Sequence, residues 1–390
     1  MYIMMKKTIL TFVTAFVSLF SAQAQTWNMI VTHEDGSTDT IPTAKVKNVS
    51  FSLPDQNADQ ILIKELYNGG CLANDGVKTF TQDQGVVLYN NCSQVAVANN
   101  LAVGFAGPYN SAASNYWYTT DGQLSYSDYI PALMGIWYFQ TPLIIQPYSQ
   151  VVISFKNAID NTQTYSNSVN YANKDYYTTY DPESGFNQTS SYAAPADVIP
   201  TSHYLKAVKY GQGTAWALSI VSPAFFIFQT QNVTPAVYAN NTDNIIYDPG
   251  KTGPVYANLK VPTSWILDGI EVYNAGGENV SKKRLTADID AGYVSLTNKL
   301  GHTLYRNVDK EATEALPENA GKLVYNYALG VGNSTDPSGI DAEASIKQGA
   351  HIIYQDTNNS TNDFHERQNS EYKNESSRWT FLQIIKRKFR

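Results

Sequence analysis

The sequence has 390 residues, which is long enough for one large domain or two medium domains with a buried core. Only 16% of the residues are charged, and a formal net charge of −7 gives no overall basic field, which argues against nucleic acid as a partner. Tyrosine occurs 28 times, and the uncharged polar residues asparagine, serine, threonine and glutamine are abundant. This composition is typical of an extracellular β-protein.

Residues 1–24 are typical of an export signal. Lys6 and Lys7 form a positive start, residues 8–20 are apolar, and Ala22-Gln23-Ala24 has the small-x-small pattern of a cleavage site. The apolar run is too short to cross a membrane, and no later stretch reaches about 18 apolar residues, so we expect no transmembrane segment in the mature chain. Because no cysteine follows the apolar run, the chain is not an evident lipoprotein. We expect an exported protein of the periplasm, of the cell surface or of the secreted fraction.

Residues 25–56 predict a small N-terminal β-hairpin and a linker. Two runs of alternating apolar residues within 26–53 surround Asp35-Gly36, a pair that favours hairpin turns because both residues tolerate positive φ. A hairpin of this size is not stable alone in water. We therefore expect it to dock on the main body or to act as a short adaptor.

Residues 57–368 predict one mainly β domain. Short runs rich in β-branched and aromatic residues alternate with Gly, Pro, Asn and Asp. Two segments, 127–135 and 309–318, have the composition of short helices. Between about residues 157 and 204 the chain becomes polar and rich in tyrosine, and we interpret this stretch as an insertion with a little structure of its own, because structureless loops of this length are uncommon in compact domains.

Residues 369–390 form a basic tail with apolar residues between the charges. The pattern fits either a short amphipathic helix that touches an anionic membrane surface or a frayed terminus after a finished domain.

Aromatic residues in two predicted loops are the best binding signal in the sequence. The candidates are Tyr116, Trp117, Tyr118 and Tyr126 in the first loop and Tyr176, Tyr177 and Tyr180 in the second. Tyrosine and tryptophan offer flat, amphipathic surfaces to sugars, aromatic ligands or partner proteins. The alternative interpretation is that these side chains pack in the core or anchor their loops.

Two further motifs have both a structural and a chemical interpretation. Cys71 and Cys92 could form one disulfide in an oxidising compartment or remain buried thiols. Asp356, Asn358 and Ser360 alternate as in a calcium loop, but the glycine and the final glutamate of that loop are missing. The same residues are also explained by a series of turns in which side chains hydrogen-bond to the neighbouring backbone. Such turns would close the last strand and bring Phe364 into the core. We therefore predict no cofactor and no metal site.

Motifs for nucleophilic catalysis or phosphate binding are absent from the sequence. A pair of carboxylates for sugar hydrolysis would come from distant strands, and Asp83, Asp268 and Glu271 lie beside predicted strands. These acids have equally good uses in turns and in the protection of sheet edges.

Six strand segments resemble those of lamin-tail domains, which are immunoglobulin-like β-sandwiches. The segments are "ILIKELYNGG", "DQGVVLYNN", "PLIIQPYSQVVIS", "WILDGIEVYN", "GHTLYRNV" and "DTNNSTNDF". They look especially like a family of exported Bacteroidota proteins, defined by a domain of unknown function, with a lamin-tail-like body. The resemblance covers about residues 60 to 366, with the stretch 157–204 apparently inserted.

The resemblance implies a non-enzymatic protein of the cell envelope that recognises a ligand or another envelope protein. It further implies an accessory role beside an outer-membrane TonB-dependent transporter for iron complexes or glycans. A hydrolase that acts on extracellular glycan and a structural or adhesive surface protein are the alternatives.

Overall fold

The computed structural model describes residues 27–47, 49, 53–277 and 280–371. The chain divides into two units, residues 1–52 and residues 53–390, which we describe separately. The predicted export signal at residues 1–24 lies outside the described residues, as do residues 372–390 of the basic tail. Within the described part of the chain, no helix has the length and apolar character needed to cross a membrane.

The first unit contains the predicted hairpin. Strands β1 (Asn28–Thr32) and β2 (Thr38–Pro42) pair antiparallel, and Gly36 in the turn has a φ of 82°. A short 3-10 helix, η1 (Thr43–Lys45), follows. Asp-Gly supplies the positive φ that this turn requires, as the sequence indicates.

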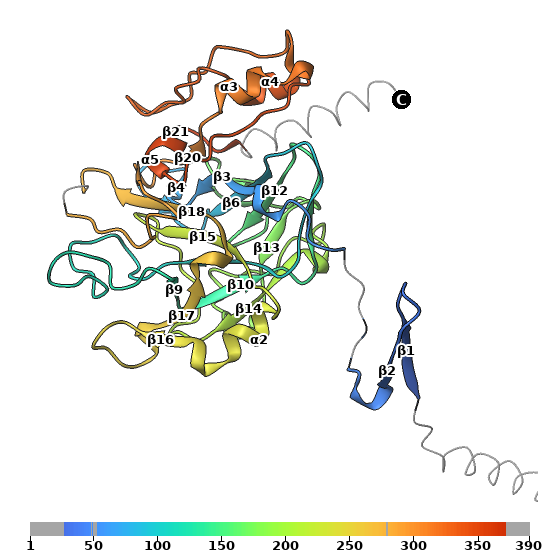
Figure 1. Cartoon of the computed structure of the whole chain (residues 1–390). Helices are drawn as coiled ribbons and strands as arrows, with labels where there is room; N and C mark the ends of the chain where they lie inside the picture. The colour runs from blue at the N-terminus through green and yellow to red at the C-terminus, as the bar shows by residue number, and fades with distance from the viewer. Residues whose placement is uncertain (1–26, 48, 50–52, 278–279, 372–390) are drawn as a thin grey trace, which may run out of the picture. The chain divides into compact units, whose positions relative to one another are not determined.

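The second unit is built on one sheet of twelve strands (Figure 1). In spatial order these are β19 (Val294–Leu296), β18 (Ile266–Asn274), β15 (Ala224–Gln229), β8 (Leu101–Phe105), β10 (Gly135–Tyr138), β14 (Tyr204–Lys209), β13 (Tyr177–Thr179), β12 (Gln150–Ser154), β6 (Gly85–Asn90), β3 (Ile61–Tyr67), β20 (Thr303–Arg306) and β21 (Phe364–Arg367).

The sheet curls so that its first and last strands, β19 and β21, lie close together. The backbone N–H of Thr297, just after β19, donates to Oε1 of Glu366 on β21 at 2.9 Å. The expected mainly β class is therefore confirmed, whereas the expected immunoglobulin-like sandwich is not. One large curled sheet replaces the two facing sheets of a sandwich and indicates another β fold.

Three small sheets and several short helices complete the unit. The small sheets are β4 (Cys71–Leu72) with β5 (Thr79–Phe80), β7 (Ala96–Ala98) with β11 (Leu143–Ile145), and β16 (Ile245–Tyr247) with β17 (Ala257–Pro262) and β9 (Tyr129–Leu133). The α-helices are α2 (Pro235–Asn240), α3 (Lys310–Glu314), α4 (Ala342–Lys347) and α5 (Ser360–Asp363). The 3-10 helices are η2 (Ala58–Gln60), η3 (Asn161–Gln163), η4 (Pro182–Ser184), η5 (Thr201–His203), η6 (Thr242–Asn244), η7 (Pro254–Tyr256), η8 (Thr263–Trp265) and η9 (Pro317–Asn319).

One of the two predicted helices is confirmed and the other is wrong. Segment 309–318 contains α3, and the Asp309 side chain accepts from the N–H of Ala312 as an N-cap. Segment 127–135 instead forms strand β9, with Pro131 opposite Lys260. Proline disrupts a helix interior, whereas β9 is the last strand of its small sheet, where a missing N–H costs little.

The stretch 157–204 contributes one short strand to the main sheet. Its strand β13 pairs in parallel with both β12 and β14. The polar composition that suggested an insertion therefore belongs to the loops on either side of β13.

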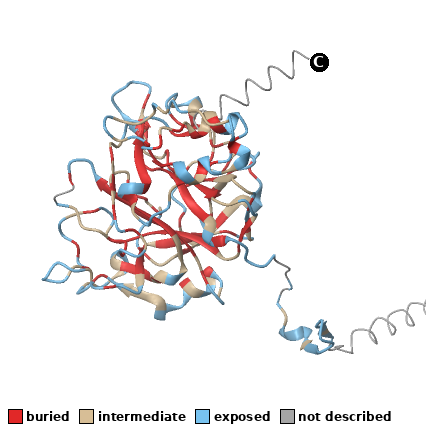
Figure 2. Ribbon diagram, turned by 45° about the horizontal axis from the view of Figure 1, so that its top comes forward, coloured by how far each residue is buried: buried red, intermediate tan, exposed pale blue. Residues whose placement is uncertain are grey.

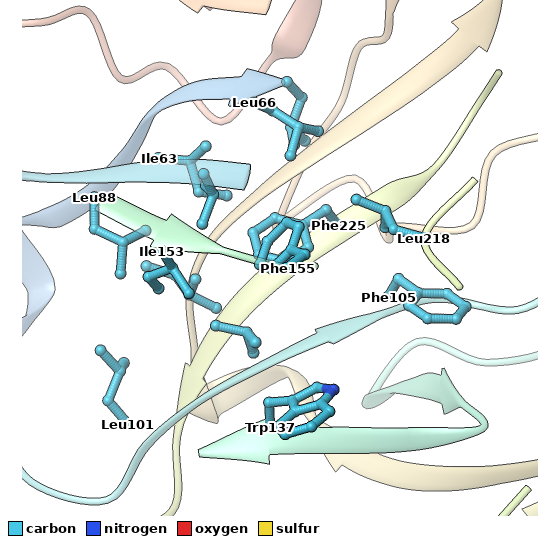
Figure 3. Close-up of a cluster of buried hydrophobic side chains, with 14 of the residues drawn as sticks. Ile63, Leu66, Leu88, Leu101, Phe105, Trp137, Ile153, Phe155, Leu218 and Phe225 are labelled. Carbon is cyan, nitrogen blue, oxygen red and sulfur yellow. The ribbon is translucent and has the colours of Figure 1, made fainter. Parts of the chain in front are cut away.

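The hydrophobic core packs against both faces of the curled sheet, with Phe225 of β15 in one buried cluster and Phe226 in another. Strands of the main sheet are buried along most of their length (Figure 2). Trp137, Phe155 and Phe225 are completely buried, and the rings of Phe155 and Phe225 lie 5.3 Å apart between their centroids (Figure 3). Continuous burial explains why the central residues of β6 are apolar on both faces rather than alternating.

A buried lysine ties the first strand of this unit to the end of its described part. Nζ of Lys64 lies 2.8 Å from Oε2 of Glu371 and 5.3–5.6 Å from the ring centroids of Tyr89, Tyr305 and Tyr354. Opposite charge and the faces of aromatic rings both compensate a buried ammonium group.

The folded body extends further along the chain than the expected end at residue 368. Ser370 and Glu371 are both buried. The last three residues before the undescribed segment therefore belong to the body rather than to the tail.

Candidate functional site

A pocket of about 450 Å³ lies between the β4–β5 hairpin and the loops that flank β13. The hairpin side contributes residues 79–82, and the other side contributes residues 157, 159–161, 164, 165 and 190. Its volume lies in the range of about 300–1,000 Å³ that is usual for small-molecule sites.

Side chains of the hairpin and of the opposite loop hold the walls of the pocket together. Asn74 in the β4–β5 turn donates to the backbone oxygen of Thr164 at 3.0 Å and accepts from the N–H of Ser166 at 2.7 Å. Phe80 and Tyr165 stack with their ring centroids 4.1 Å apart and an angle of 14° between the ring planes. These contacts join segments that are about 90 residues apart in the sequence.

Asn157 and Asp160 shape the second wall. Asn157 has a φ of 45° and donates to the backbone oxygen of Ser190 at 3.2 Å. Asp160 caps η3 by accepting from the N–H of Thr162 at 3.1 Å, and its other oxygen accepts from Gln163. Both side chains therefore serve the loop itself.

The lining contains uncharged polar groups, two aromatic rings and one carboxylate. Lysine, arginine and histidine are absent from it. The arrangement can offer hydrogen bonds and apolar ring surface to a ligand, but it offers no cation to balance a negative charge.

The predicted aromatic residues of the first loop do not line this pocket. Trp117 and Tyr126 are buried, the indole N–H of Trp117 donates to Asp248 at 3.1 Å, and the Tyr126 hydroxyl donates to the backbone oxygen of Arg284 at 2.6 Å. Burial raises the pKa of the Tyr126 hydroxyl well above its ordinary value. These two side chains anchor the loop, as the alternative interpretation of the sequence states.

Tyr116 and Tyr118 remain accessible, but lysines of the same protein cover part of their rings. Nζ of Lys251 lies 4.3 Å from the centroid of Tyr116, and Nζ of Lys282 lies 4.9 Å from that of Tyr118. Each of these cation–π contacts occupies one face of the ring and so reduces the surface on which a ligand could stack.

The residues predicted from the second loop belong to or adjoin β13. Tyr176 is buried, and Tyr177 packs against Phe139 and stacks on His203. Tyr180 contacts Tyr204 edge to face. None of these three tyrosines lines the pocket. One wall of the pocket comes from the polar stretch 157–204, but the predicted aromatic residues are not among the lining residues.

Asp356, Asn358 and Ser360 serve as turn residues. Oδ1 of Asp356 accepts from Arg306 at 3.1 Å, and the hydroxyl of Ser360 donates to Oδ2 of Asp290 at 2.6 Å. Asn358 has a φ of 52° and its backbone oxygen accepts from Ala291. Asp363, also in this loop, accepts from the N–H groups of Thr357 and Asn359.

The predicted delivery of Phe364 to the core is confirmed, because this residue is buried at the start of β21. Across the described residues, no group of three His, Cys, Asp or Glu side chains is arranged to hold a metal ion.

Cys71 and Cys92 are not joined in the structure, so the disulfide that the sequence left open is not formed. β3 and β6 pair antiparallel, with Tyr67 opposite Gly85 and Ile61 opposite Asn90. Cys71 follows one end of this pair and Cys92 follows the other. The six-residue strand β6 separates them by about 20 Å, far beyond the reach of a disulfide.

The three acids considered for sugar hydrolysis have separate partners. Asp83 accepts from Tyr67 at 2.6 Å, Asp268 pairs with Arg306, and Glu271 pairs with Arg284. Burial raises the pKa of Asp268 to about 7, against the opposing effect of Arg306. None of the three lines the pocket.

The comparisons with known proteins concern fold and family. The family model described as "Protein of unknown function (DUF4876)" matches residues 146–371. The crystal structure of a DUF4876 family protein from Bacteroides thetaiotaomicron VPI-5482 matches with a TM-score of 0.55 and 17% identity, over 86% of this chain and 80% of that chain. Comparison with curated proteins gives no match. Because the family model covers more than half of the sequence, the chain belongs to the DUF4876 family.

Proposed function

We propose that this protein is an exported, non-enzymatic recognition protein of the cell envelope and that it binds a small ligand in the pocket between the β4–β5 hairpin and the loops around β13. The observation that carries the proposal is the pocket itself. Its size suits a small molecule, and fixed side-chain contacts join its two walls. A site that is already formed loses little conformational entropy on binding.

The lining favours binding over hydrolysis. Asp160 is the sole carboxylate among the lining residues. Its oxygens accept hydrogen bonds from Thr162 and Gln163. Hydrolysis of a glycosidic bond by the usual mechanisms requires two carboxyl groups on either side of that bond.

Export rests on the signal-like residues 1–24 and on a composition typical of extracellular proteins. The recognition role and the outer-membrane transporter as partner were implied by the sequence resemblance of the strand segments, and they do not depend on the sandwich fold. Copurification of such a transporter with the tagged chain tests that part of the proposal.

A thermal-shift screen of the purified full chain tests the ligand-binding role. The panel contains glycans, siderophore-like ferric chelates and divalent metal ions. A ligand at about 100 times its Kd stabilises the folded state by about 2.7 kcal/mol. We expect one class to stabilise the wild type and the Tyr116→Ala control but not Tyr165→Ala, and we expect the ligand to be recovered unchanged. Absence of stabilisation by every class, or release of product without stable binding, contradicts the proposal.

A further inference from the structure

We propose that the ligand of this pocket is a neutral saccharide, an inference that rests on the recognition role proposed above. Seven of the eleven lining residues are threonine, serine, asparagine or glutamine. A sugar presents many hydroxyl groups that both donate and accept hydrogen bonds. Hydroxyl and amide side chains match them because they too can do both.

Several lining groups remain available for a ligand. Within the described part of the chain, the hydroxyls of Thr79, Thr81, Thr164 and Ser190 and the amide nitrogen of Gln82 make no side-chain hydrogen bond. By contrast, Asn157 and Asp160 are used within the walls. The lining therefore separates into groups that build the pocket and groups that can face its contents.

Tyr165 supplies the apolar surface that a sugar ring requires. Its ring stacks on buried Phe80, while the Tyr165 side chain itself remains partly exposed. Stacking fixes the orientation of the ring without closing it off from the pocket. An amphipathic aromatic side chain can then contact the C–H groups of a sugar and also hydrogen-bond its hydroxyls.

Charge distinguishes this ligand class from the alternatives. Anionic iron chelates, phosphates and acidic sugars are recognised by arginine, lysine or helix N-termini. The lining has no cationic side chain, and the carboxylate of Asp160 lies in its wall. A neutral ligand suffers no repulsion from that carboxylate and needs no counter-charge.

Calorimetric titration of the full chain with neutral oligosaccharides, with acidic oligosaccharides and with ferric hydroxamate and catecholate chelates tests the inference. We expect binding of a neutral oligosaccharide whose affinity does not change with ionic strength, because screening acts only between charges. Tyr165→Ala should weaken it at least about tenfold, which corresponds to about 1.4 kcal/mol. Thr81→Val and Thr164→Val should each weaken it several-fold.

Matched controls separate the pocket from the rest of the surface. Tyr116→Ala removes an accessible tyrosine elsewhere, and Thr252→Val removes an exposed threonine hydroxyl outside the pocket. Both should bind like the wild type. Tyr165→Phe keeps the stacked ring and removes only the hydroxyl group. It replaces Tyr165→Ala as the test variant if Tyr165→Ala does not fold.

Three other outcomes would each contradict part or all of the proposal. If a ferric chelate or an acidic sugar binds and Tyr165→Ala abolishes that binding, the recognition role stands and the saccharide inference fails. If a neutral saccharide binds equally to Tyr165→Ala and Thr164→Val, the pocket is not its site. If no class binds, both the inference and the proposed function fail.

Discussion

Replacement of Glu65 by glutamine should change how the stability of this protein depends on pH. Glu65 lies on β3 and is completely buried, and its Oε2 accepts from the N–H of Glu371 at 3.3 Å. Burial, and then the charge of Glu371, raise the pKa of the Glu65 carboxyl from 4.5 to about 8, although Arg367 opposes the change. The folded protein thus keeps a proton on Glu65 up to about pH 8.

The pKa of Glu65 differs between the folded and the unfolded protein, and this difference sets the sign and the size of the effect on stability. The unfolded chain releases the proton near the ordinary pKa of 4.5, so between that pH and about 8 the unfolded state binds fewer protons than the folded state. The free energy of unfolding therefore falls as pH rises through this interval. At about 1.36 kcal/mol per pKa unit, the total loss is about 5 kcal/mol.

Glutamine has nearly the same shape as the protonated carboxyl and does not ionise. Denaturant unfolding of the wild type and Glu65→Gln at intervals between about pH 5 and pH 9 measures the difference. We expect the curve of the variant to be flatter and the variant to be the more stable protein at the alkaline end. Glu183→Gln, at an exposed position, should follow the wild type. Parallel curves for wild type and Glu65→Gln would refute the reasoning.

Three further predictions concern the core and the cysteines. Glu271→Gln leaves a completely buried arginine without its charged partner, so denaturant unfolding should show a loss of about 3–5 kcal/mol; a loss below about 1 kcal/mol contradicts a buried ion pair. Trp117→Ala should cost about 3–5 kcal/mol and Tyr116→Ala less than about 0.5 kcal/mol, because the first side chain is 4% exposed and the second 49%; equal losses contradict the anchoring role of Trp117. Without reductant, a thiol reagent should label Cys92 in the folded protein and Cys71 only after unfolding, since Cys71 is buried; no labelling after unfolding would indicate a disulfide.

Two local patterns predicted local structure correctly, although the helix expected in segment 127–135 is strand β9. Asp35-Gly36 predicted the hairpin turn, and the acidic start of segment 309–318 predicted α3 with its Asp309 cap. The mainly β class followed from β-branched and aromatic runs. Each of these features depends on residues that are close in the sequence.

Long-range arrangement could not be predicted in the same way. β3 lies between β6 and β20, and the partner residues Leu66 and Leu304 are more than 200 positions apart. Strand sequences that suit a sandwich suit a single curled sheet equally well, because both bury alternating or continuous apolar runs. The order of strands is set by packing across the whole domain.

The candidate site shows the same limit. Phe80 and Tyr165 form one wall contact although 85 positions separate them in the sequence, and 28 tyrosines were available for the role. Density of aromatic residues led to Trp117 and Tyr126, which are core residues. The segment "KKRL" likewise gave no sign that its arginine, Arg284, is completely buried and pairs with Glu271.

The most direct test of the central claim is a crystal structure of the full chain grown with the neutral oligosaccharide that binds best in calorimetry. The account predicts electron density for a sugar ring against Tyr165, with hydrogen bonds to the hydroxyls of Thr81 and Thr164. Density at Tyr116 and Tyr118 with an empty pocket would contradict it.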